Sequence, residues 1–99
     1  MNNKRMESYD VYMELELYKK RLAKLEAESE QLDEAWSAAI KYAEDEELPR
    51  DKWDEADAAA EAAQKAYKAC EEKVETITNI VRLMAELAEE MEFLEELDK

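Results

Sequence analysis

Regularly spaced carboxylates are the residues of this sequence that could carry chemistry. Glu71, Glu72 and Glu75 stand in the pattern E-E-x-x-E, and after nineteen further residues Glu95 and Asp98 form the pattern E-x-x-D. Carboxylate oxygens are ligands that divalent cations such as Mg²⁺ prefer. Whether these carboxylates can act together depends on the helices that carry them.

This pattern resembles the magnesium-binding signature of the all-α nucleoside triphosphate pyrophosphohydrolases, the MazG and dimeric dUTPase group. The resemblance implies that Glu71, Glu72, Glu75 and Asp98 would hold magnesium over the phosphates of a nucleotide. In that family the two halves of the signature lie on separate helices that fold back together. Here no helix breaker lies between residues 51 and 97, and a continuous helix would hold the halves more than about 30 Å apart. The enzyme hypothesis is therefore kept only as an alternative.

Other catalytic chemistry lacks its usual residues. The chain has no histidine, the common general base and zinc ligand, and no glycine, so it has no phosphate-binding loop. The single cysteine, Cys70, falls among apolar neighbours, where we expect inert packing. We therefore predict a protein without catalytic, metal-binding or cofactor-binding residues.

Composition and periodicity together predict an all-α fold. Ala, Glu, Leu and Lys dominate, and the only proline is Pro49. Two series of residues at alternating steps of three and four predict an apolar seam along each of two helices. The first series is Val11, Leu15, Tyr18, Leu22, Leu25, Ser29, Leu32, Trp36, Ala39 and Ala43. The second is Trp53, Ala56, Ala60, Ala63, Tyr67, Cys70, Val74, Ile77, Val81, Met84, Ala88 and Met91.

These series predict one all-α domain over residues 1–99, folded as an antiparallel helical hairpin. We expect a helix over about residues 5–44, a turn over about 45–50 and a helix over about 51–97, with Pro49 in the first turn of the second helix. Folding about residues 49 and 50 would place Trp36 opposite Ala63, Leu32 opposite Tyr67 and Ser29 opposite Cys70. A register one heptad shorter, with Trp36 on Ala56, is an alternative.

Apolar residues outside the two seams predict a further contact. A two-helix hairpin buries one stripe per helix and is marginal alone, so we expect two copies to form a four-helix bundle. Ile80, Leu97 and Phe93 also flank the second seam. The same surface could instead dock a different protein. The predicted interface residues are Met6, Tyr9, Met13, Leu17, Leu83, Leu87 and Leu94.

Acidic residues are concentrated at two places, and they predict a partner with a basic surface. The net charge is −14, residues 44–57 hold eight acids against Arg50 and Lys52, and residues 86–98 hold seven acids and no base. In the hairpin we expect Lys4 and Arg5 to lie beside Glu95 and Glu96. Exposed acids can serve solubility alone, or rows of carboxylates can imitate the phosphates of nucleic acid. The predicted partner-binding acids are Glu44, Asp45, Glu46, Glu47, Asp51, Asp54, Glu55, Asp57, Glu89, Glu92, Glu95 and Glu96.

Size, charge and helicity give this chain a second resemblance. Small, glycine-free, strongly acidic helical proteins resemble the nucleic-acid-mimicking inhibitors of phages and mobile elements, including some anti-restriction and anti-CRISPR proteins. The resemblance implies an inhibitor of a nucleic-acid-handling protein. A coiled-coil assembly or adaptor protein that acts through its apolar stripes is the alternative.

Charge and hydropathy also bear on location. A chain this acidic is not expected to bind nucleic acid or anionic lipid directly. No uncharged run is long enough to span a membrane, and MNNKRMESYD lacks the apolar stretch of a secretory signal. A single cysteine forms no internal disulfide, so we expect a reducing cytoplasm, which for a viral protein would be that of the host.

Overall fold

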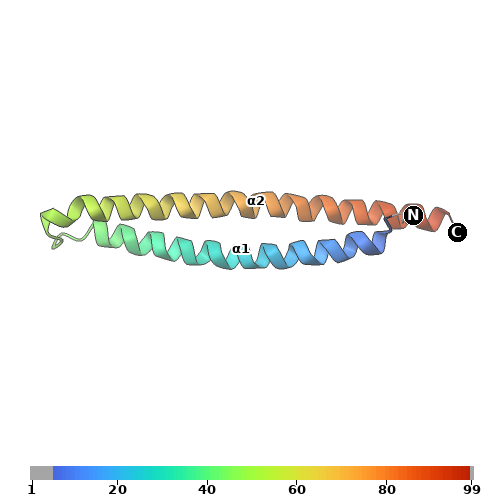
Figure 1. Ribbon diagram of the computed structural model, residues 1–99, viewed down its shortest axis with the longest axis horizontal. Helices are drawn as coiled ribbons and strands as arrows, with labels where there is room; N and C mark the ends of the chain where they lie inside the picture. The colour runs from blue at the N-terminus through green and yellow to red at the C-terminus, as the bar shows by residue number, and fades with distance from the viewer. Residues whose placement is uncertain (1–5, 99) are drawn as a thin grey trace, which may run out of the picture. The chain divides into compact units, whose positions relative to one another are not determined.

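The described part of the chain consists of two helices joined by a turn. The computed structural model describes residues 6–98, which contain α1 (Ser8–Ala43), the short 3-10 helix η1 (Arg50–Lys52) and α2 (Trp53–Leu97) (Figure 1). No residue in that range forms a β-strand, and the all-α prediction is confirmed. The predicted helix start near residue 5 lies outside the described residues.

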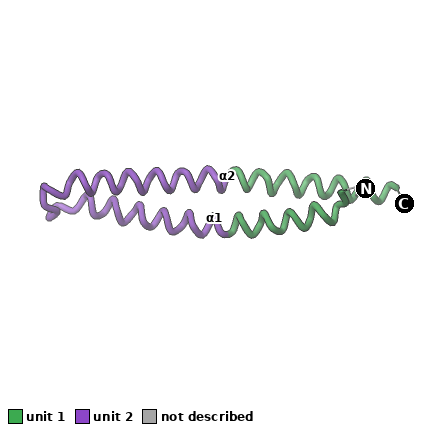
Figure 2. Tube along the Cα trace, in the orientation of Figure 1, with its two compact units in different colours: residues 1–23, 75–99 green, residues 24–74 purple. Residues whose placement is uncertain are grey.

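The chain divides into two compact units, each with part of α1 and part of α2 (Figure 2). Unit 1 comprises Met1–Ala23 and Glu75–Lys99, and unit 2 comprises Lys24–Val74 with the turn. Within each unit the two helices pack against each other in opposite directions, as the predicted hairpin requires.

Of the residues that are buried in the described chain, all but Leu48 belong to the predicted seams. Every residue of the first series is buried or half-buried, and so is every residue of the second series except Trp53. Val11 and Leu15 are buried in unit 1 with Ala88, while Ala56 and Cys70 are buried in unit 2. In coiled-coil notation these seam residues occupy positions a and d, and the positions around them are b, c, e, f and g. The seams are therefore readable from periodicity alone.

Cross-helix contacts in unit 2 give its register. The rings of Trp36 and Tyr67 lie 5.5 Å apart at an angle of 31°. The hydroxyl of Ser29 donates a hydrogen bond of 2.6 Å to Glu71, next to its predicted neighbour Cys70. Tyr67 lies one helical turn from the predicted neighbour Ala63 on α2, so both contacts fall within about one turn of the predicted register. The register with Trp36 on Ala56 is not adopted.

Unit 1 has a matching antiparallel register. The backbone N–H and the hydroxyl of Ser8 donate hydrogen bonds of 2.8 and 2.7 Å to the two carboxylate oxygens of Glu95. One helical turn further along α1, the hydroxyl of Tyr12 donates a bond of 2.9 Å to Glu92. The predicted neighbours of Glu95 and Glu96, namely Lys4 and Arg5, lie outside the described residues.

The turn differs from the prediction at Pro49. Its ψ of 145° is extended rather than helical, so Pro49 precedes η1 instead of lying in the first turn of α2. The carbonyl of Pro49 accepts the backbone N–H of Lys52 at 2.9 Å, which closes the 3-10 turn. This additional turn delays the start of α2 to Trp53.

Trp53 is not a seam residue, contrary to the prediction. Its side chain is 49% exposed, and its indole N–H donates a hydrogen bond of 3.0 Å to the carbonyl of Leu48. α1 already ends at Ala43, and the Trp53 side chain is bonded to the turn instead of packing in the seam. Leu48, which the periodicity did not single out, is buried there instead.

Candidate protein-binding surfaces

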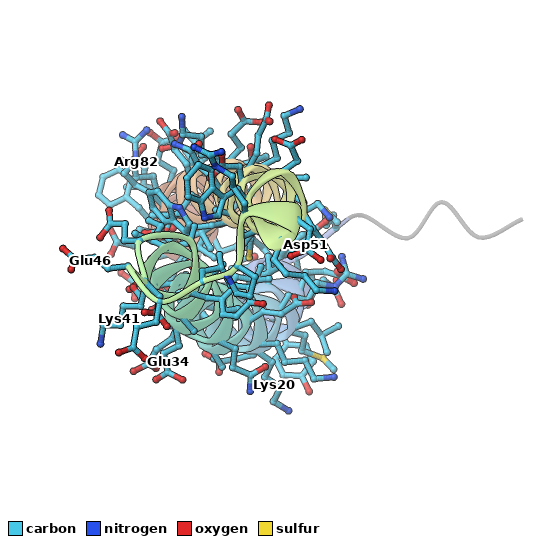
Figure 3. All side chains as sticks on the ribbon, turned by 90° about the vertical axis from the view of Figure 1, so that its left-hand side faces the viewer. Lys20, Glu34, Lys41, Glu46, Asp51 and Arg82 are labelled. Carbon is cyan, nitrogen blue, oxygen red and sulfur yellow. The ribbon has the colours of Figure 1, made fainter. Side chains whose placement is uncertain are left out.

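The acidic turn of unit 2 presents its carboxylates to solvent. All eight predicted acids of residues 44–57 are exposed, and Figure 3 shows Glu46 pointing away from the helices. Asp45 accepts the backbone N–H of Glu47 at 3.0 Å, and Glu55 pairs with Lys52 at 3.7 Å. The side chains of the other six form no hydrogen bond or ion pair with any described residue: Glu44, Glu46, Glu47, Asp51, Asp54 and Asp57.

The two bases within the turn do little to neutralise it. The Arg50 guanidinium lies 5.5 Å from the centre of the Trp53 ring, a cation–π distance. Lys52 forms an ion pair with Glu55. Eight acids and two bases leave a local charge of −6 over fourteen residues. Folding needs little of this charge, because a turn and a helix start use only one or two acids.

The second predicted acidic group has a partly structural role. Of its four members, Glu92 and Glu95 hold α1 to α2 through Tyr12 and Ser8. The hydrogen bond to Glu92, followed by burial and the charge of the carboxylate, raises the pKa of the Tyr12 hydroxyl. Glu89 and Glu96 are exposed. This role could have been predicted from the sequence only if the alignment of α1 against α2 were known to within one residue.

Unit 1 carries most of the exposed apolar surface. Ten of the twelve large apolar or aromatic side chains that are exposed in the described chain belong to it. Its end has an open groove of about 690 Å³, lined by Met6 and Glu7 just before α1 and by Leu94 and Leu97 of α2, among others. All predicted interface residues are exposed, by 47% to 67%: Met6, Tyr9, Met13, Leu17, Leu83, Leu87 and Leu94.

The carboxylates of the magnesium-like pattern are not brought together. α2 is continuous from Trp53 to Leu97, so Glu75 and Glu95 lie twenty residues, or about 30 Å, apart on one helix of unit 1. Glu71 is already engaged by the hydroxyl of Ser29 in unit 2. Within the described residues, no three Asp, Glu, Cys or His side chains are grouped closely enough to hold a metal ion.

Comparison with known proteins gives no family for this chain. No family model, no curated protein and no solved structure matches it. Function must therefore be argued from the surfaces themselves.

A polar layer crosses the seam of unit 2. Ser29 is buried with 7% of its surface exposed, and the thiol of Cys70 donates a hydrogen bond of 3.5 Å to the carbonyl of Leu25. Burial raises the pKa of the Cys70 thiol, and the charges of Glu28 and Glu71 add to this effect while Lys73 opposes it. A thiol in this state is a poor nucleophile.

Neither helix of the described chain is long and apolar enough to cross a membrane. The surfaces that remain for function are a solvated row of carboxylates in unit 2 and an exposed apolar face in unit 1. The first suits electrostatic recognition of a basic surface, and the second suits packing against another helix.

Proposed function

We propose that this chain is a non-enzymatic acidic protein that binds another protein through its acidic turn. The partner is a nucleic-acid-handling protein with a basic groove, and binding inhibits it by occupying the place of nucleic acid. This is the mode of action of nucleic-acid mimics in phage and mobile-element anti-defence. The setting is the cytoplasm, that of the host if the protein is viral.

The observation that carries this proposal is the state of the turn carboxylates. Six of the eight have no side-chain partner among the described residues, so their charge is available for contact. Their density also matters, because a basic groove built for phosphates gains most where several anions meet it at once. The Glu89 and Glu96 carboxylates in unit 1 are exposed in the same way.

The test begins with a pull-down from source cells at low salt and identification of the captured protein by mass spectrometry. Binding of that protein is then measured at salt from about 50 to about 500 mM, where exposed charge pairing is screened. We expect affinity to fall at least about tenfold over this range. A partner that binds equally well at both salt concentrations contradicts the proposal.

A matched pair of triple variants separates the turn from charge in general. Glu46→Gln, Glu47→Gln and Asp54→Asn remove three negative charges from the turn, and Glu26→Gln, Glu30→Gln and Glu34→Gln remove three from the exposed surface of α1. The turn variant should lose binding, while the α1 variant should retain it. Equal losses would assign the effect to net charge alone.

The exposed apolar face of unit 1 favours a second candidate function. In this alternative the chain is a coiled-coil assembly or adaptor protein that acts through its apolar residues. Met13→Glu or Leu87→Glu would then abolish binding of the captured protein, and neutralising the turn would not affect it.

We also propose that two copies associate through this apolar face into a four-helix bundle. The support is the small core: among the described residues no large side chain has less than 2% of its surface exposed. Two stacked hairpins would bury the residues that one hairpin leaves in water.

A further inference from the structure

The apolar face of unit 1 lies along one flank of the helix pair. We define it as Met6, Met13, Leu17, Ile80, Leu83, Leu87, Leu94 and Leu97. Glu7 and Leu94, both at g positions, line the same groove, so the g edges of α1 and α2 adjoin on this flank. The opposite flank is marked by the e positions Tyr12 and Glu92, which are joined by a hydrogen bond.

The amount of exposed surface suits a partner of considerable size. The chain has an accessible surface of 8280 Å², whereas a folded monomer of 11.6 kDa is expected to have about 5800 Å². The difference of about 2400 Å² exceeds the roughly 800 Å² that each partner buries in an interface of standard size. This excess belongs to the whole chain, and ten of its twelve exposed large apolar side chains in the described residues lie in unit 1.

The charges of unit 1 are sorted between its two ends. Unit 1 ends at Ala23 on α1 and begins at Glu75 on α2, so residues 19–21 and Arg82 lie toward the same end of this unit. All four bases among the described residues of unit 1 are at that end, namely Lys19, Lys20, Arg21 and Arg82. The other end carries Glu7, Asp10 and the seven acids of residues 86–98. Figure 3 shows Lys20 and Arg82 pointing outward.

We propose that the apolar face is covered by the same face of a second copy, related by a two-fold axis perpendicular to the helices. This inference rests on the self-association proposed above and specifies its geometry. Each helix then lies antiparallel to its own counterpart, so the basic end of one copy meets the acidic end of the other. A parallel arrangement would place acid against acid, which disfavours it.

Arg21 and Glu7 provide the specific contact. Arg21 lies in α1 and Glu7 lies just before its first residue, Ser8; both are exposed, and they stand two heptads apart in the same g register on the edge of the apolar face. An axis near Glu14, midway between them, brings Arg21 of each copy to Glu7 of the other. Because the interface is isologous, the pair occurs twice.

The test is the dimer dissociation constant of the full chain, measured by sedimentation equilibrium, with circular dichroism to verify helicity. Arg21→Glu should raise Kd about three- to tenfold, since two exposed ion pairs become like-charge pairs. The swapped variant Arg21→Glu with Glu7→Arg should restore the Kd of the parent. Leu87→Glu should raise Kd about a hundredfold or more. Tyr42→Glu is the matched control, because Tyr42 is an exposed aromatic residue of α1 in unit 2, outside this face, and should leave Kd unchanged.

Each contrary result has a definite meaning. If Arg21→Glu lowers the dimer Kd or leaves it unchanged while Leu87→Glu still abolishes the dimer, the antiparallel geometry is wrong. Self-association through this face is then still supported. A chain that is monomeric at all concentrations, or a dimer insensitive to Leu87→Glu, overturns the use of this face by a second copy. Neither result bears on binding through the acidic turn, which the turn triple variant tests separately.

Discussion

The hydroxyl of Ser29 donates a hydrogen bond of 2.6 Å to the carboxylate of Glu71 across the seam of unit 2. Ser29 occupies an a position between apolar seam residues, where leucine would pack more surface. A polar residue at such a position typically fixes register at some expense of stability. The Ser29–Glu71 bond, with Cys70 and Leu25 beside it, therefore fits a role in holding α1 and α2 in their observed alignment.

Removal of this bond should weaken the fold measurably. Ser29→Ala is expected to lower the free energy of unfolding by about 1 kcal/mol, because the charge-assisted hydrogen bond is lost while Glu71 can still be solvated. The measurement is urea denaturation followed by circular dichroism. Ser37→Ala, at an exposed position of the same helix, is the control and should change stability by less than about 0.5 kcal/mol. Equal effects of the two variants would show that the bond contributes nothing.

The Tyr12–Glu92 pair predicts a pH dependence on the alkaline side. The hydrogen bond to Glu92 raises the folded-state pKa of Tyr12 above its ordinary value of 10.0. Its contribution to stability is therefore fully present below about pH 10 and is lost as the pH rises through the raised pKa. An NMR titration of the Tyr12 ring should show this pKa, and Glu92→Gln should return it toward the ordinary value. A Tyr12 pKa that does not respond to Glu92→Gln contradicts the pairing.

Much of the fold could be predicted because its cause is local. A strict seam repeat places the same apolar stripe on one helix face wherever the chain is helical, and this is why Val11 and Cys70 could both be assigned to the interior. Trp53 fits the same repeat and is nevertheless half-exposed, because burial also requires a helix opposite it. Beyond the end of α1, the periodicity of α2 does not indicate which of its residues are buried.

The roles of the candidate site residues depend on how α1 is aligned against α2, and the spacing of residues within one helix does not give that alignment. The sequence alone does not distinguish an acidic residue that faces water, such as Glu46, from one that accepts a hydrogen bond from the other helix, such as Glu92. The short 3-10 helix after Pro49 delays the start of α2 to Trp53, and no residue in the turn announces that delay. Exposed apolar residues such as Leu87 were predictable, since they lie outside both seams.

Magnesium-dependent hydrolysis of nucleotides gives a direct test of the non-enzymatic proposal. The chain with magnesium should release no pyrophosphate from any common nucleoside triphosphate above the rate of a blank. The physical reason is the separation of Glu75 and Glu95 along α2, which leaves no shared site for one ion. Release of pyrophosphate that is abolished by Glu72→Gln would instead establish the enzyme alternative, and Glu61→Gln, elsewhere on α2, is its control.

Glu14 offers the sharpest prediction for the two-fold arrangement in unit 1. It is an exposed g residue midway between Glu7 and Arg21, so an axis at this point brings the two copies of Glu14 close to each other. Like charges so placed oppose association, and Glu14→Gln should therefore lower the dimer Kd, by about two- to fivefold at low salt. The gain should shrink as salt is added, since the repulsion is screened. Glu16→Gln, at a b position on the other flank, removes the same charge and should leave Kd nearly unchanged. If both variants tighten the dimer equally, general repulsion between two acidic chains explains the result, and the axis does not pass near Glu14.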